Sequence, residues 1–148
     1  MAFQITESCS GCTACTKRCP TEAIRGERKQ LHRIASHLCI DCGACGVVCP
    51  SSAILDARGT PTVMLKKPQR PRAFVDELAC TGCEKCVDRC AFDCLEVEEG
   101  AGAHFGVMRV DEAKCTGCRE CESACPYDAI FVFRRDQRPD WLTPSVAA

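Results

Sequence analysis

Apolar residues in this chain occur in short stretches between polar and cysteine-rich segments, and no stretch has the length of a membrane-spanning helix. One short pattern occurs four times, in which a turn-forming segment ends in a small residue followed by Ile or Leu. The four copies lie at residues 20–24, 50–54, 91–95 and 126–130. Each copy predicts a tight turn that runs into a short strand.

A longer hairpin is predicted between strands at residues 95–97 and 105–110. The connecting segment, residues 98–106, is rich in glycine. It lacks both the G-x-G-x-x-G register and the βαβ context of a dinucleotide-binding loop. We therefore predict a flexible hairpin here and no nucleotide site.

The apolar residues are too few to form an ordinary core. The chain has 148 residues, of which 46% count as hydrophobic, but this share includes 17 cysteines. Without them, about a third of the chain is apolar, which barely offsets chain entropy in small lobes. An odd cysteine count fits disulfides poorly, and the N-terminus has no signal-peptide pattern. We therefore expect a cytoplasmic protein without membrane insertion, whose cysteines bind metal.

Sixteen of the cysteines form four runs of the pattern C-x2-C-x2-C-x3-C. The runs are Cys9, Cys12, Cys15 and Cys19; Cys39, Cys42, Cys45 and Cys49; Cys80, Cys83, Cys86 and Cys90; and Cys115, Cys118, Cys121 and Cys125. This spacing resembles the iron–sulfur run of bacterial ferredoxins, in which the fourth cysteine ligates the other cluster of a pair. Three thiolates two residues apart on a tight loop can hold three irons of one cubane cluster, so we expect four [4Fe-4S] clusters.

Small residues in these runs support a tightly turning loop. Gly11, Gly82 and Gly117 precede the second cysteine of their runs, and Gly43 follows it. The main alternative metal is zinc, which uses C-x2-C pairs but needs only four ligands in all. The third cysteine of each run would then be surplus, and this favours iron–sulfur clusters over a zinc-stabilised interaction scaffold.

The runs are grouped in two pairs. Their first cysteines lie 30 residues apart in the first pair and 35 in the second, and a proline-rich basic segment separates the pairs. We expect lobes at residues 1–60 and 73–134, a linker at 61–72 and a C-terminal tail at 135–148. Each lobe resembles a bacterial dicluster ferredoxin, and residues 3–6 match the first strand of that family in the first lobe. The resemblance implies an α+β fold of two tandem ferredoxin-like βαββαβ lobes.

The resemblance also implies which cysteines share a cluster. The implied sets are Cys9, Cys12, Cys15 with Cys49; Cys39, Cys42, Cys45 with Cys19; Cys80, Cys83, Cys86 with Cys125; and Cys115, Cys118, Cys121 with Cys90. In proteins that resemble the electron-transfer subunit of molybdopterin reductases, the first run pairs instead with the fourth and the second with the third. The linker between the second and third runs favours the sequential pairing.

No constellation for bond chemistry accompanies these runs, so we expect a non-catalytic electron-transfer protein. It is similar to the ferredoxin subunits that accompany tungsten-dependent aldehyde oxidoreductases in anaerobic metabolism. The resemblance implies a catalytic partner subunit with a tungsten or molybdenum pterin, and a flavoprotein. The alternative is a free soluble polyferredoxin that serves several enzymes.

Charge is distributed unevenly along the chain. Residues 1–70 carry 10 basic and 5 acidic residues, whereas residues 71–148 carry 9 and 15. A cluster with four thiolates adds a charge of about −2. Such a dipolar molecule can dock by its two ends or associate head to tail with itself. A solvated acidic face that only aids solubility explains the asymmetry equally well, and nucleic acid is a poor partner.

Three further features allow two interpretations each. Cys94 stands where the other copies of the turn have alanine, so it is a small buried side chain or a spare ligand or redox thiol. The histidines His32, His37 and His104 are expected at the surface or beside a cluster rather than as ligands. Trp141 lies in a polar tail that is a frayed terminus or a docking segment.

Overall fold

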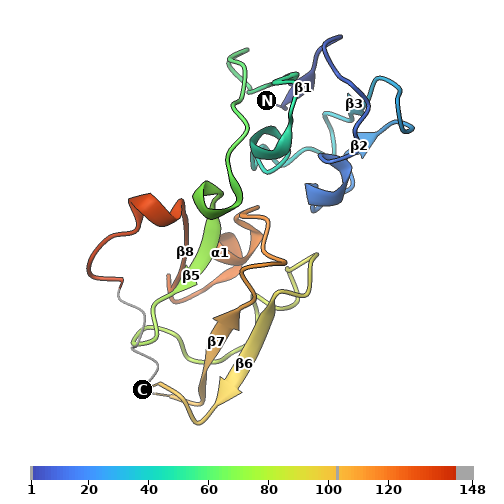
Figure 1. The fold of residues 1–148 in the computed structure, drawn as a ribbon. Helices are drawn as coiled ribbons and strands as arrows, with labels where there is room; N and C mark the ends of the chain where they lie inside the picture. Colours follow the sequence, from blue (N-terminus) through green and yellow to red (C-terminus); the bar gives the residue numbers. More distant parts are fainter. Residues whose placement is uncertain (1, 103, 143–148) are drawn as a thin grey trace. The chain divides into compact units, whose positions relative to one another are not determined.

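The structure is a computed structural model that describes residues 2–102 and 104–142. The chain divides into two compact units, Met1–Lys67 and Pro68–Ala148 (Figure 1). The division falls inside the expected linker, residues 61–72. Thr62 donates its N–H to the Ile54 carbonyl and Leu65 donates to Val47, which fastens the first part of that segment to the first unit. Within the described residues, no helix is long and apolar enough to cross a membrane.

The first unit contains four very short strands. They are β1 (Gln4–Ile5), β2 (Ile24–Arg25), β3 (Arg33–Ile34) and β4 (Ile54–Leu55). β1 pairs antiparallel with β4, and β2 pairs antiparallel with β3. β2 and β4 directly follow two of the repeated turns, as the sequence pattern predicts.

The second unit has longer strands. They are β5 (Arg72–Val75), β6 (Leu95–Glu99), β7 (Gly106–Val110) and β8 (Ile130–Phe133). β6 and β7 form the expected hairpin, of which residue 103 lies outside the described residues, while β5 pairs antiparallel with β8 (Figure 1). β6 follows the third cysteine run and pairs with β7. β8 follows the fourth run and pairs with β5.

The helices among the described residues are short, with three to five residues each. They are η1 (Thr16–Arg18), η2 (Gly46–Val48), η3 (Lys67–Gln69), α1 (Glu120–Ala124) and η4 (Arg135–Gln137). η1 and η2 each lie between the third and fourth cysteines of a run, and α1 ends just before the fourth cysteine of the last run. Only three residues separate those cysteines, so no more than one turn fits. The α+β expectation therefore holds for the strands, and the helical part is smaller than the resemblance implies.

Cysteine is a large part of both hydrophobic cores. The core of the first unit includes Cys15, Cys45 and Cys49 beside Ile24, Ala53 and Ile54. The core of the second unit includes Cys80, Cys86, Cys94 and Cys115 beside side chains from β5, β6, β7 and β8. In both units, side chains from the strands therefore pack directly against cysteines.

The described part of the expected tail packs onto the second unit. The ring of Trp141 meets Phe131 edge to face at 5.3 Å between centroids, and Arg138 lies over the ring of Phe74. Leu142 is almost fully buried. Arg138 and Trp141 of the tail thus contact rings on β5 and β8, and residues 143–148 of the expected tail lie outside the described residues.

Candidate metal centres

All four cysteine runs share one unusual backbone conformation. The two residues that flank the second cysteine have positive φ angles in every run. Before that cysteine stand Gly11, Asp41, Gly82 and Gly117, and after it stand Thr13, Gly43, Glu84 and Arg119. Two left-handed residues around one cysteine curl the chain tightly, so that its first three thiols can face a common centre.

In three of the runs, close contact with neighbouring backbone is a further reason for glycine before the second cysteine. A Cβ atom at Gly11 would lie 2.4 Å from the Gln30 nitrogen, and one at Gly117 would lie 2.6 Å from the Pro71 oxygen. The corresponding Cβ at Gly82 would lie 2.9 Å from the carbonyl oxygen of Gly106. Neighbouring backbone thus presses against these loops, whereas the exposed Asp41 has room for its side chain.

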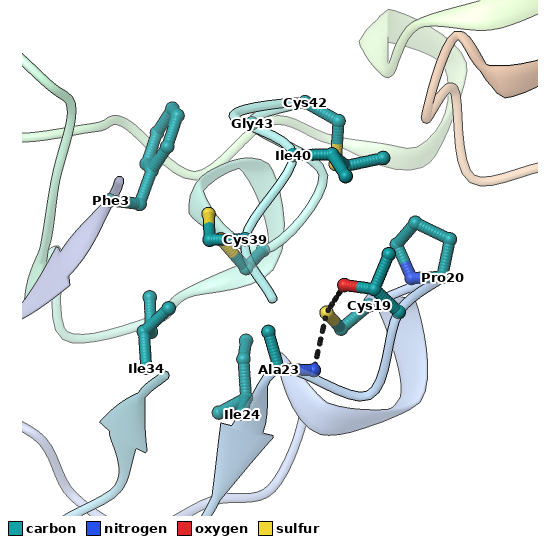
Figure 2. Close-up of a pocket in the computed structure, with 12 residues that line it drawn as sticks. Phe3, Cys19, Pro20, Ala23, Ile24, Ile34, Cys39, Ile40, Cys42 and Gly43 are labelled. Carbon is teal, nitrogen blue, oxygen red and sulfur yellow. Dashed lines mark hydrogen bonds between the residues drawn. The ribbon is translucent and has the colours of Figure 1, made fainter. Parts of the chain in front are cut away.

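Three cavities are each lined by four cysteines. The cavity in Figure 2, of about 310 Å³, has Cys39, Cys42 and Cys45 on one loop and Cys19 on another. A second cavity of about 300 Å³ is lined by Cys9, Cys12, Cys15 and Cys49. A third, of about 280 Å³, is lined by Cys80, Cys83, Cys86 and Cys125. Each set takes three thiols from one run and the fourth from the other run of the same unit.

The remaining cysteines form a more crowded group. Burial raises the pKa of Cys118, and nearby Cys115 and Cys90 raise it further. The pKa of Cys121 is raised to about 12, first by burial and then by neighbouring thiols that include Cys115, Cys118 and Cys90. Cys94 joins this group, because its Sγ atom lies 3.3 Å from that of Cys90, and the neighbouring thiol of Cys115 raises the pKa of Cys94.

The linings of the three cavities coincide with three of the sets that the ferredoxin resemblance implies. The fourth set, Cys115, Cys118, Cys121 with Cys90, stays a prediction. Of the two interpretations of Cys94, a small buried side chain or a spare thiol, the structure fits both, because it places this residue, buried, among the thiols of one set. Ligation itself stays a prediction. Among the described residues, no cluster of His, Cys, Asp and Glu converges on one point closely enough for a single ion.

Backbone N–H groups point at several of the sulfur atoms. Ala23, Ala53 and Ala129 donate to Cys19, Cys49 and Cys125, each at 3.3 Å, and the first of these bonds is drawn in Figure 2. These alanines hold the same place in three of the repeated turns. Met108 on β7 donates to Cys80, and Ala73 on β5 donates to Cys115, both at 3.4 Å. Such donors stabilise negative charge on sulfur.

Buried thiols in these cavities have raised pKa values. Burial, followed by neighbouring thiolates, raises the pKa of Cys15 to about 11 and that of Cys45 to about 12. In the same kind of cavity, the Nε2 atom of His32 and the Oγ1 atom of Thr81 are buried without a hydrogen-bond partner among the described residues. A cation-containing group that bonds to sulfur removes the repulsion between thiolates, so the donor set suits a [4Fe-4S] cluster.

Comparison with known protein families agrees with this donor set. Residues 2–56 match a family described as "4Fe-4S dicluster domain", and residues 79–129 match a second family of the same description. The chain carries two 4Fe-4S dicluster domains in tandem. Two such domains imply four [4Fe-4S] clusters, which confirms the cofactor prediction.

The curated relatives match over a short segment. One is a subunit of the ion-translocating oxidoreductase complex of Rhodobacter capsulatus, with 50% identity over 34 residues, which is 23% of this chain and 18% of the relative. The corresponding protein from Cereibacter sphaeroides is 44% identical over 36 residues, 24% of this chain and 19% of the relative. The match thus spans about a fifth of the length of these relatives.

A solved structure that is similar to this chain belongs to the "Formate dehydrogenase - heterodisulfide reductase - formylmethanofuran dehydrogenase complex" of Methanospirillum hungatei. The likeness covers 84% of this chain and 51% of that chain, at 23% identity and a TM-score of 0.38.

Sequence reasoning missed the surroundings of the cysteines. No motif indicates that His32 enters a cysteine cavity, since it lies 23 residues from Cys9 in the sequence. The donors Ala73 and Met108 come from strands outside the runs. Only Cys94 carries a usable signal, because it interrupts a series of three alanines.

Proposed function

We propose that this chain is a non-catalytic electron-transfer subunit of a cytoplasmic oxidoreductase complex. The observation that carries the proposal is the presence of two 4Fe-4S dicluster domains whose cysteines meet in groups from paired runs. The proposed ligand sets are those implied by sequential pairing of the runs. The curated relatives support a role within a complex, because their names describe them as subunits of one.

When bound, a [4Fe-4S] cluster accepts one electron and passes it on. The chain holds each cluster by four thiolates and aims backbone N–H groups, such as that of Ala53, at the sulfur atoms. Burial of Cys15 and Cys45 keeps water from one side of their cavities. Cys12 and Cys83 are exposed, so their loops are the places where a partner can approach most closely.

The partners follow from this role. We propose a catalytic subunit as electron donor or acceptor, with a tungsten or molybdenum pterin enzyme as the candidate that the sequence resemblance suggests, and a flavoprotein at the other end. The matches to ion-translocating complexes favour a second candidate, in which the chain serves a complex of that kind.

Anaerobic purification of the untagged protein from its own cells tests the proposal. We expect about sixteen irons and sixteen acid-labile sulfides per chain. We also expect a broad visible absorbance that fades with dithionite, and co-purifying catalytic or flavin-containing subunits. Stoichiometric zinc with little iron would point to the zinc scaffold. Full iron content in a chain that always runs alone would favour the free carrier.

A further inference from the structure

His32 is a buried polar side chain that the proposed function does not use. It is only 1% exposed, and it lines the cavity of Cys9, Cys12, Cys15 and Cys49. Its ring lies close to Gly26, where an added Cβ atom would be 2.7 Å from the ring Cγ. The other two histidines, His37 and His104, are exposed.

The hydrogen bonding of the ring determines which nitrogen carries a proton. Nδ1 of His32 lies 3.0 Å from the carbonyl oxygen of Gln30, which can only accept a hydrogen bond. Nδ1 therefore bears hydrogen. The same atom lies 4.0 Å from the Sγ atom of Cys9, so the N–H that it donates to Gln30 also lies beside this sulfur. Nε2 of the same ring is buried and has no hydrogen-bond partner among the described residues.

We propose that His32 raises the reduction potential of the cluster held by Cys9, Cys12, Cys15 and Cys49. The positive end of an N–H dipole beside a ligand sulfur stabilises the extra negative charge of the reduced state. No histidine lines the cavities of the sets that contain Cys19 or Cys125, among the residues described there. The inference rests on the proposed ligand set, and it singles out one of the four clusters.

Two substitutions at position 32 separate the dipole from the volume of the ring. His32→Leu removes the N–H and keeps a bulky apolar side chain. His32→Asn is smaller but can present its amide N–H close to the place of Nδ1. In an anaerobic redox titration of the full chain followed by electron paramagnetic resonance, we expect His32→Leu to move one reduction step to lower potential. His32→Asn should keep that step near its original potential, and the other three steps should not move in either variant.

His37→Asn is the matched control, because it changes an exposed histidine of the same unit. It should leave all four reduction steps in place. An unchanged potential in His32→Leu with full iron content would overturn the proposal. Equal shifts in His32→Leu and His32→Asn would also overturn it, since they would assign the effect to packing.

A spectroscopic measurement covers the case in which His32→Leu loses its cluster. Pulsed electron paramagnetic resonance of the reduced, unsubstituted chain with ¹⁵N-labelled histidine should show a hyperfine coupling to one cluster. The coupling should disappear in His32→Asn and persist in His37→Asn. Its absence from the unsubstituted chain would overturn the proposal. A chain without iron–sulfur signals would instead contradict the proposed function, so the two failures are distinguishable.

Discussion

Cys49 and Cys90 hold the same place in their runs but have different neighbours. The sulfur of Cys49 accepts a hydrogen bond from the backbone of Ala53 at 3.3 Å. In the third run the residue at the corresponding place is Cys94, and its thiol lies 3.3 Å from the sulfur of Cys90. Cys90 therefore has a second thiol beside it, whereas the corresponding neighbour of Cys49 offers only a methyl group and an amide.

Cys49→Ala tests the pairing of the cysteine runs. We expect loss of about four of the sixteen irons, because one cluster loses its fourth ligand. Alkylation under anaerobic conditions, followed by peptide mapping, should label Cys9, Cys12 and Cys15. Labelling of the run that begins at Cys80 would contradict sequential pairing and support the interleaved one.

Cys90→Ala tests whether Cys94 can replace a ligand. We expect this variant to keep more iron than Cys49→Ala, because the thiol of Cys94 lies within reach of the same site. The double variant Cys90→Ala/Cys94→Ala should lose as much iron as Cys49→Ala. Cys94→Ala alone is the control and should keep about sixteen irons, since alanine fills this place in the other three turns. Equal iron loss in Cys90→Ala and Cys49→Ala would exclude replacement.

The loops of the cysteine runs depend on backbone conformation as well as on sulfur. Gly11 has a φ of +67° and lies against the backbone of Gln30, whose carbonyl oxygen is the partner of His32. Gly59, in the same unit, has a φ of +81° and nothing near its place for a Cβ atom. The two glycines share the left-handed conformation and differ in the close contact.

Gly11→Ala and Gly59→Ala separate these two effects. Alanine in the left-handed region costs about 1 kcal/mol of unfolding free energy, and we expect this cost for Gly59→Ala. Gly11→Ala should cost more and should also lower the iron content, because the new methyl group displaces Gln30. Denaturant unfolding and iron analysis of both variants measure the difference. Equal costs and full iron in both would show that the contact with Gln30 does not matter.

The strands were predictable where a repeat marked them. The turns at residues 20–24 and 50–54 lead directly into β2 and β4, because a small residue and a large apolar one follow a tight turn in each. The packing of Trp141 on Phe131 was not predictable, since a polar segment with one aromatic residue shows no preferred partner.

The cysteines of the site were predictable from their motifs, but the residues that surround them were not. Spacing indicates which cysteines act together, because the same spacing occurs four times along the chain. The spacing carries no information about residues that reach a cavity from outside the runs, such as His32. The position of His32 depends on the path of the chain between Gln30 and β3. It also cannot indicate that backbone from Gln30, Gly106 and Pro71 presses on three of the loops.

On the scale of the whole molecule, both units depend on a small amount of apolar packing. Among the described residues, the main buried cluster of the first unit has six members, of which three are cysteines. Its strands span two residues each, and such short strands are not stable by themselves in water. On the proposed ligand sets, a cluster held by thiols from two runs would join these separate segments.

Removal of the iron should therefore unfold the chain. With the clusters gone, buried thiols such as Cys45, whose pKa is raised to about 12, remain as neutral side chains that no longer cross-link the loops. The gain from the small apolar cores does not offset the chain entropy released. We expect anaerobic chelation to abolish the dispersed amide signals in nuclear magnetic resonance spectra, and reconstitution with iron and sulfide to restore them. An iron-free chain that kept dispersed signals and a compact hydrodynamic radius would show that side-chain packing, and not the metal, holds the two units together.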